Sequence, residues 1–321
     1  MEQYKCLSLI GRGHSADVYL ARGSGQTRLV AIKERQKQKV IDLDEAANLQ
    51  REVEALQTLN KSSHPFLVNL VDVFQTTHAV YLVEDFASGG DLDFHIGKKP
   101  FTAEQTRFYA AELCLAIKDL HEHDIIHRNI KLENILLAAD GHIVLAGFGT
   151  CKPETTDDSS TREFVGGGNF MAPEVWRDQG YGRPADWWAF GITLYQMLLR
   201  EEPFKGDDLD EVYDAILSDA EPNYPDSLPE KSVDILRSLL VLDPRQRLGS
   251  GEAGAVRVMQ HPYFEGISWD DVAEKKIEPS FIPVRNDESD LCNFDPEFTK
   301  AQGNLPQLEG QTLPFTTAGS S

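Results

Sequence analysis

The sequence predicts an α+β protein with two lobes, in which a small antiparallel sheet is followed by a larger helical part. Short apolar runs broken by glycines dominate the first 86 residues, and long stretches with helical periodicity follow from Thr102 onward. Strands that come first and helices that come after, without alternation, are typical of the α+β class. The chain has 321 residues, which is enough for a sizeable core in such a fold.

The small lobe is predicted from three strand-like runs and one helix. The runs YKCLSLIGRGHSADVYLAR, RLVAIKER and AVYLVEDF indicate strands of one antiparallel sheet. Between the last two runs, Leu49, Val53 and Leu56 recur at helical spacing, so one helix interrupts the sheet. A hinge to the second lobe is expected at residues 86–90.

Helices account for most of the second lobe. The segment TAEQ, which begins at Thr102, is a capping-box pattern that opens a long helix. One face of this helix is expected to carry Tyr109, Leu113, Ile117 and Leu120. Further helices are predicted over residues 186–199 and 230–241, and ADGH is predicted as a hairpin turn. Beyond residue 264 the periodicity fades, and the terminal FTTAGSS is predicted to be disordered.

The composition indicates which kinds of partner the protein binds and in which compartment it is found. The formal net charge of −21 argues against nucleic acid or an anionic membrane as a partner and favours a cationic protein or peptide. The four cysteines contain no C-x-x-C pair, which indicates neither a zinc site nor a disulfide scaffold. No apolar run approaches the roughly 20 residues of a membrane span. We therefore expect a protein of the cytosol or the nucleus.

A phosphate-binding site is predicted near the N-terminus. In GRGHSADV, Gly11 and Gly13 would let backbone N–H groups approach phosphates, although an ordinary hairpin gives the same pattern. In VAIK, Lys33 could bind phosphates while Glu52 of the following helix holds it in place. The alternative is that Lys33 is an exposed lysine on an edge strand.

The second lobe carries further motifs in a fixed order. In IIHRNIKLENILL, Lys131 would meet a terminal phosphate and Asn134 a metal ion. The segments LAGFGTCK, MAPEVW, ADWWAFG and DPRQRLG follow. So many matches in one order exceed what chance would produce.

Together these motifs resemble a eukaryotic protein kinase domain over residues 4–264. HPFLVNL, SGGDLDFHI, EQTRFYAAELCLAI and DWWAFGITLYQML are similar to the AGC group, nearest the protein kinase C branch. The resemblance implies a bilobal kinase fold with an N-lobe at 4–86 and a C-lobe at 87–264. FIPV and NFDPEFT resemble the AGC C-terminal tail, here residues 265–321, which would bring Phe294 towards the nucleotide site.

The resemblance also implies a nucleotide site with an unusual gatekeeper. That position is Glu84, followed by Asp85, and a carboxylate there is costly to bury unpaired. We expect Glu84 either to pair with Lys33, in competition with Glu52, or to reach water. The nucleotide-binding residues that the resemblance implies are Gly11, Gly13, Val18, Ala31, Lys33, Glu52, Glu84, Asp91, Leu136 and Phe294.

Three positions depart from an active kinase. Asn129 stands where the family has the proton-accepting Asp, and Gly147 stands where it has the Asp that binds Mg²⁺. Gly167 replaces a Thr that contacts the catalytic Asp. Loss of a general base costs about 10²–10⁴-fold in rate, and phosphoryl transfer depends still more on metal charge. Only the neutral Asn134 remains as a metal ligand, so ATP binding is expected to be weak and independent of Mg²⁺.

Other positions indicate that the active shape is kept. Glu163 maps to the activation-loop phosphothreonine of the family, and its expected partners are Arg128 and Lys152. The alternative is a solvated loop glutamate. Glu174 with Arg247 is expected to form a buried ion pair, and Asp186 is expected to cap the catalytic-loop backbone.

The resemblance further implies a site for basic peptides. Asp91 and Glu133 occupy two positions at which basophilic AGC kinases read arginines, whereas Gln196 replaces a third acidic residue. The alternative is that Asp91 contacts only ribose and Glu133 faces only water.

The leading hypothesis is a pseudokinase of AGC type that acts through protein partners, as scaffold, allosteric partner or competitor. The alternative is a serine/threonine kinase of low activity with unconventional catalytic groups, for which Lys33, Glu52, Lys131 and Asn134 argue. A nucleotide or metabolite sensor is a third hypothesis, and it rests on Glu84 and Asp85.

Overall fold

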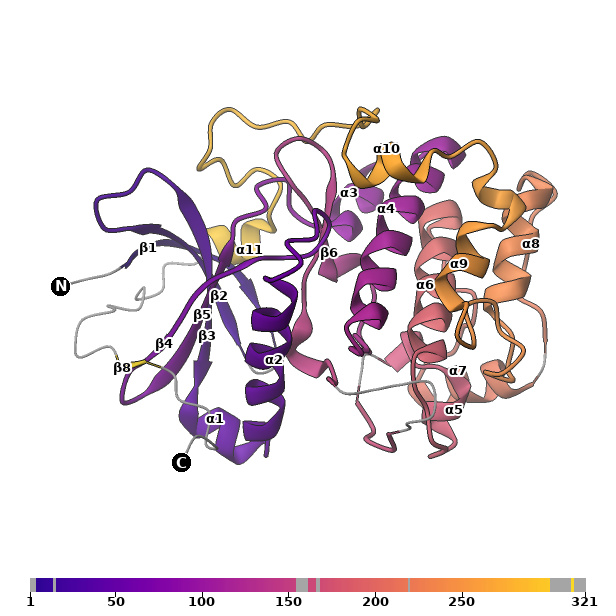
Figure 1. Cartoon of the computed structure of the whole chain (residues 1–321), viewed down its shortest axis with the longest axis horizontal. Helices are drawn as coiled ribbons and strands as arrows, with labels where there is room; N and C mark the ends of the chain where they lie inside the picture. The colour runs from indigo at the N-terminus through magenta and orange to yellow at the C-terminus, as the bar shows by residue number, and fades with distance from the viewer. Residues whose placement is uncertain are drawn as a thin grey trace.

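The protein folds into two lobes joined by a short hinge, as the sequence predicts (Figure 1). The computed structural model describes residues 4–13, 16–153, 161–165, 168–218, 220–300 and 313–314. The expected disorder of the terminal FTTAGSS concerns residues outside these ranges.

The small lobe is an antiparallel sheet with the order β1-β2-β3-β5-β4-β8 in the described residues. Its strands are β1 (Tyr4–Arg12), β2 (Asp17–Gly23), β3 (Leu29–Gln36), β4 (Leu70–Gln75), β5 (Ala79–Asp85) and the two-residue β8 (Leu313–Pro314). Its helices are α1 (Lys37–Asp42) and α2 (Ala46–Leu59). Neither α1 nor β4 is predicted from the sequence pattern.

The strand register places four of the predicted nucleotide-binding residues on one face of the sheet. Val18 lies opposite Lys33, and Ala31 lies opposite Glu84. Residues opposite each other in an antiparallel pair share a face, and residues two apart on a strand do so too. The intervening Ile32 is fully buried in an apolar cluster on the other face.

Helix α2 packs on the sheet as its periodicity predicts. Leu49, Val53 and Leu56 are all buried, and so is Glu52. Burial of a carboxylate at this point of an apolar face requires a cationic partner, and β3 supplies two.

The large lobe is mostly helical, with a small hairpin next to the hinge. Its helices are α3 (Leu92–Lys98), α4 (Ala103–Glu122), α5 (Pro173–Trp176), α6 (Pro184–Leu199), α7 (Leu209–Leu217), α8 (Glu230–Leu239) and α9 (Gly254–Met259). Its strands β6 (Ile135–Leu137) and β7 (Ile143–Leu145) pair with each other. The capping box predicted at Thr102 is present, with both reciprocal hydrogen bonds to Gln105. The predicted α4 face is buried around Leu113 and Ile117.

Main-chain hydrogen bonds join the lobes at two places. The segment before β4 pairs with β7, since Val68 N donates to Leu145 O at 3.0 Å and Leu145 N donates to Phe66 O at 2.8 Å. In the hinge, Leu137 N donates to Gly90 O at 2.7 Å. The small lobe is thereby tied to the hairpin that borders the cleft.

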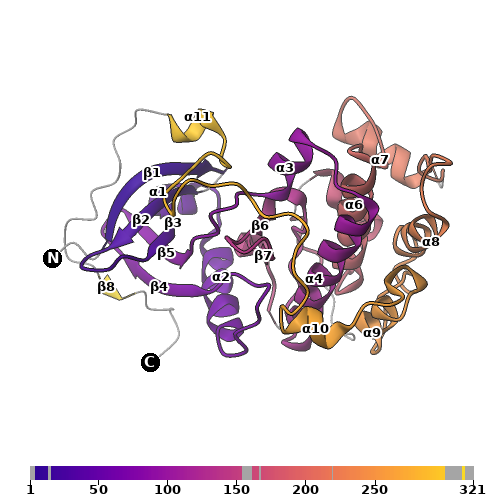
Figure 2. The same cartoon turned by 90° about the horizontal axis from the view of Figure 1, so that it is seen from above.

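The tail returns across both lobes (Figure 2). After α10 (Trp269–Ala273) it passes Phe101, whose ring lies 5.6 Å from that of Phe281. It then crosses the hinge, where the ring of Phe294 stacks on Phe86 at 5.6 Å, and forms α11 (Pro296–Thr299) against β1. None of the described helices is long and apolar enough to cross a membrane.

Candidate functional site

The predicted nucleotide site begins with a glycine-containing turn between β1 and β2. Gly11 lies opposite Val18 in the register, and Gly13 N donates to Ala16 O at 2.7 Å. The tip of the turn, His14 and Ser15, lies outside the described residues.

Two cations from β3 converge on the buried carboxylate of α2. Lys33 Nζ donates to Glu52 Oε1, and Arg35 Nη1 donates to Glu52 Oε2 at 3.1 Å. The other arm of Arg35 reaches Glu45 Oε2 at 2.6 Å. The contact between Lys33 and Glu52 agrees with the prediction from the sequence, whereas the contact of Arg35 with Glu52 was not predicted. The two-residue spacing of Arg35 from Lys33 places both on one face of the strand.

Glu84 lies beside this cluster and is partly exposed. Burial raises the pKa of its carboxyl to about 7, against the opposing charge of Lys33, which lowers it. Among the described residues, Lys33 forms its ion pair with Glu52 rather than with Glu84. Partial exposure agrees with the other expectation, that Glu84 reaches water.

Asn129, Asn134 and Gly147 lie together, with the side-chain amide of Asn134 in contact with both of the other residues. Asn134 Nδ2 donates to the main-chain oxygen of Asn129 at 2.7 Å. Gly147 has φ +85°, and a Cβ atom built there would lie 2.5 Å from Cγ and Oδ1 of Asn134. The side chain of Asn134 therefore occupies the space that a larger residue at Gly147 would need.

The residues present do not fit a resident Mg²⁺ ion. Such sites use at least one carboxylate, and none stands at Asn129 or Gly147. In the part of the chain that the structure describes, no group of three His, Cys, Asp or Glu side chains is arranged to hold a metal. Lys131 Nζ lies 3.4 Å from Glu133 Oε1, so the ammonium predicted to meet a phosphate has an exposed carboxylate beside it.

Asp186 fixes the backbone of the catalytic loop. Its two carboxylate oxygens accept from the main-chain N–H groups of His127, at 2.9 Å, and Arg128, at 2.8 Å. His121 Nε2 also lies 2.9 Å from Oδ2. Burial raises the pKa of Asp186, but these partners outweigh it and leave the pKa lowered. Arg128 itself has φ +66°, a left-handed conformation that this loop imposes on a non-glycine residue.

Glu163 is surrounded by three cations. Its Oε1 lies 2.8 Å from Lys152 Nζ, and its Oε2 lies 3.0 Å from Arg128 Nη1 and 2.7 Å from Arg51 Nη1. Burial raises the pKa of the carboxyl, but the hydrogen bonds from Lys152, Arg51 and Arg128 outweigh burial and lower it to about 2. Gly167, the third departure from the family pattern, lies outside the described residues.

The acidic residues expected to read arginines have other contacts as well. Asp91 caps α3, since its Oδ1 accepts from Phe94 N at 2.8 Å, and burial raises its pKa to about 6. It also bridges to Leu136 of the hairpin. Gln196 Nε2 donates to Glu202 Oε1 at 3.3 Å, which brings a carboxylate next to the position that lacks one.

The large lobe holds the expected buried ion pair. Arg247 Nη1 and Nη2 donate to Glu174 Oε1 and Oε2 at 2.7 and 2.8 Å, and both side chains are fully enclosed. This bidentate contact anchors α5, which follows the activation segment.

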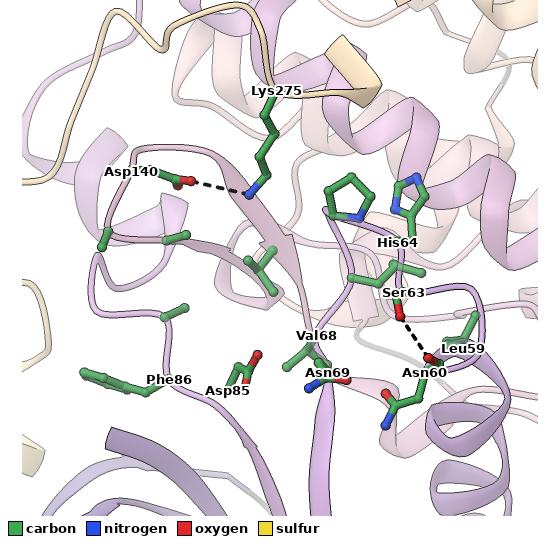
Figure 3. A pocket seen from close by; sticks show the side chains of 16 residues that line it. Leu59, Asn60, Ser63, His64, Val68, Asn69, Asp85, Phe86, Asp140 and Lys275 are labelled. Carbon is green, nitrogen blue, oxygen red and sulfur yellow. Dashed lines mark hydrogen bonds and ion pairs between the residues drawn. The ribbon is translucent and has the colours of Figure 1, made fainter. Parts of the chain in front are cut away.

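A separate cavity of about 590 Å³ lies between the hinge and the segment before β4 (Figure 3). Asp85 and Phe86 border it on one side, and His64 and Lys275 lie across from them, with Lys275 Nζ 3.5 Å from Asp140. None of the residues predicted to bind the nucleotide lines this cavity.

Two lobes, a lysine–glutamate pair between β3 and α2, and a loop at residues 127–128 capped by a buried aspartate define the protein kinase fold. Residues 4–264 match the family described as protein kinase domain, and the chain belongs to this family.

The relatives that it matches are kinases of the AGC group, and their names are protein kinase C-like and serine/threonine-protein kinase N2. Protein kinase C-like 2 of Schizosaccharomyces pombe is 46% identical over 308 residues, which cover 96% of this chain and 30% of that protein. Protein kinase C-like 1 of Saccharomyces cerevisiae is 40% identical over 308 residues, 96% of this chain and 27% of that protein. Serine/threonine-protein kinase N2 of Danio rerio is 40% identical over 299 residues, 93% of this chain and 30% of that protein. The chain thus spans less than a third of the length of these relatives.

Proposed function

We propose that the chain is an AGC-type pseudokinase, which acts by binding protein partners and transfers phosphate weakly or not at all. The observation that carries the proposal is the contact between Asn134 and Asn129, next to Gly147. The two positions that supply the base and the metal carboxylate in the family hold an amide and a glycine. Asn134 fills the space beside the glycine, so no neighbouring carboxylate takes over there.

The cleft retains groups for a nucleotide, and we propose weak binding that does not require Mg²⁺. When bound, ATP would supply anionic phosphates and an adenine ring. Lys33 would hold phosphates from β3, Gly11 and Gly13 would offer main-chain N–H groups, and Ala31 and Leu136 would border the ring. Glu84 opposes an anionic ligand when it is ionised, which is a reason for low affinity.

We further propose that Glu163 replaces an activation-loop phosphate. Three basic side chains reach its carboxylate, and its lowered pKa keeps it ionised at any physiological pH. A phosphate would carry more charge and more acceptor oxygens, so the imitation is partial. Its effect is to hold the activation segment against α2 without a modification.

A second candidate is a serine/threonine kinase of low activity. The bond from Lys33 to Glu52 and the burial of Phe148 favour it, because both belong to an assembled cleft. The names of the relatives also favour it. We prefer the pseudokinase proposal because the carboxylates that the family has at the positions of Asn129 and Gly147 are both missing.

We propose that the chain consists of an N-lobe at 4–86, a C-lobe at 87–264 and a tail at 265–321. Cytosolic or nuclear location is supported by four cysteines that form no disulfide in the structure.

The proposal on the nucleotide is tested by thermal unfolding with ATP, in Mg²⁺ and in EDTA. Equal shifts of the unfolding midpoint are expected in both. A shift that needs Mg²⁺ would mean that a carboxylate elsewhere holds the ion, and the pseudokinase reading would lose its main support.

A further inference from the structure

We propose that Arg35 is a second cation that holds Glu52, so that α2 keeps its place whether or not Lys33 keeps its own bond to Glu52 when it binds the phosphate of a metal-free nucleotide. The inference rests on the proposed nucleotide site and names the residue that adapts it to a ligand without Mg²⁺. Arg35 would act as a positioning residue, since it reaches the ligand only through Glu52.

The two oxygens of Glu52 have different cationic partners. Lys33 donates to Oε1 and Arg35 to Oε2, and the two basic residues lie two positions apart on the same face of β3. If Lys33 turns towards an anion, Oε2 keeps its bond to Arg35. The carboxylate is then never left buried without a partner, which would cost much more than the exchange of one cation for another.

Burial separates the roles of the two cations. The side chain of Arg35 is 2% exposed and that of Glu52 is 0% exposed, whereas Lys33 is 17% exposed. Arg35 is therefore shielded from a ligand, and Lys33 is the cation that can reach one. Both lie at the turn after Phe148, since a Cβ atom at Gly149 would be 3.6 Å from Arg35 Nη1 and from Lys33 Nζ.

Arg35 is itself held at its far side. Its Nη2 lies 2.6 Å from Glu45 Oε2, at the residue that precedes α2. One guanidinium thus bridges the start and the middle of the helix, which a single ammonium group cannot do with the same geometry. This fork holds α2 against β3 when the cleft is empty.

The charges around the phosphate position agree with a metal-free ligand. A carboxylate at Gly147 would repel phosphates unless a metal ion lay between them, and this chain has none there. Lys33 can then act as a direct counter-ion without a metal ion to offset an acid at position 147, although Glu84 opposes the phosphates when its carboxyl is ionised.

The test compares Lys33→Met with the unaltered protein by hydrogen exchange over residues 46–59, and measures ATP affinity in EDTA on the same samples. We expect the exchange of α2 to change less than twofold and the ATP affinity to fall at least tenfold. Lys5→Met, on an exposed position of β1, controls for loss of a lysine. Faster exchange of α2 in Lys33→Met, by tenfold or more, would overturn the inference.

The reciprocal variants are Arg35→Met and Glu45→Gln, with Arg22→Met as a control on an exposed arginine. Both are expected to speed exchange of α2 at least tenfold. Glu45→Gln removes only the outer anchor of Arg35, so it serves if Arg35→Met fails to fold. Normal exchange in Glu45→Gln together with loss of α2 protection in Lys33→Met would assign the holding role to Lys33.

The outcomes for the two proposals are distinct. Absence of ATP binding in EDTA to the unaltered protein would overturn the ligand proposed here. Phosphate transfer by the unaltered protein would overturn the pseudokinase reading, while the exchange of α2 in Lys33→Met would still decide the role of Arg35.

Discussion

Arg51 Nη1 lies 2.7 Å from Glu163 Oε2, and this contact joins α2 of the small lobe to the activation segment of the large lobe. The next residue along α2, Glu52, points about 100° further round the helix, into the contact with Lys33 and Arg35. Two consecutive residues therefore tie α2 to two different parts of the structure. In the account proposed above, this fixed helix gives partners a preformed surface without phosphorylation.

Replacement of Glu163 by Ala is expected to loosen the activation segment. Three cations lose their shared acceptor, and we expect a loss of about 1 kcal/mol in the free energy of unfolding, because the carboxylate is one-third exposed. Hydrogen exchange over residues 161–165 and 46–59 is the measurement. The loss of stability in the double variant Glu163→Ala, Arg51→Ala should be smaller than the sum of the two single losses, because both changes remove the same contact. Full additivity, or no change in Glu163→Ala relative to an exposed control such as Glu221→Ala, would make Glu163 an ordinary loop residue.

Glu84 is expected to make stability fall between pH 4.5 and 7. Its pKa is raised from 4.5 to about 7 in the folded protein, first by burial. In that window the folded protein holds the proton and the unfolded chain does not, so the stabilising effect is complete below the unfolded pKa and is lost as pH rises through the folded one. With a discount for partial exposure, the change is on the order of 2 kcal/mol. The free energy of unfolding in urea, measured against pH, should not show this fall in Glu84→Gln. Identical pH profiles of Glu84→Gln and the unaltered protein would contradict a raised pKa of Glu84.

Arg-rich peptides are expected to bind the cleft in a salt-sensitive manner. Asp91→Asn and Glu133→Gln should each weaken binding several-fold, because each removes a carboxylate near the catalytic loop. Asn can still cap α3, so Asp91→Asn separates charge from helix stability. Fluorescence polarisation across a salt series is the measurement, with the exposed Glu252→Gln as control. Binding that ignores both changes would place the peptide surface elsewhere.

Gly147→Asp is expected to destabilise the protein more than Gly25→Asp does. Both glycines have positive φ, +85° and +71°, which costs an aspartate about 1 kcal/mol. Only Gly147 also faces a neighbour within 2.5 Å, the side chain of Asn134, whereas nothing lies within 4 Å of a Cβ atom at Gly25. Urea unfolding of both variants isolates the cost of moving Asn134, and equal losses would show that this space is not occupied.

The elements that the sequence predicts well are those with a local cause. The capping box at Thr102 and the apolar face around Val53 depend on residues a few positions apart, and both are present. The short α1 and α3 have too few turns for a periodic signal, and β4 has only mixed burial. The sequence does not predict α1, α3 and β4, because tertiary packing determines these elements more than the periodicity of their own residues does.

The contacts of the site show the same division. The bond from Lys33 to Glu52 follows from motif spacing, but Arg51 meets Glu163 across 112 positions of sequence. Whether Arg51 points towards the activation segment depends on the rotation of α2, and that is set by the packing of the whole lobe. Arg35 could have been found from its place on the Lys33 face of β3, as a charge that needs an acidic partner.

The central proposal is that this kinase fold transfers phosphate weakly or not at all, and radiolabelled ATP with Mg²⁺ or Mn²⁺ tests it most directly. The purified chain is incubated with and without basic peptides, beside the Lys33→Ala variant. We predict incorporation at background in both proteins, because no carboxylate stands at Asn129 or Gly147. Transfer above background that disappears in Lys33→Ala would show an intrinsic activity and contradict the account.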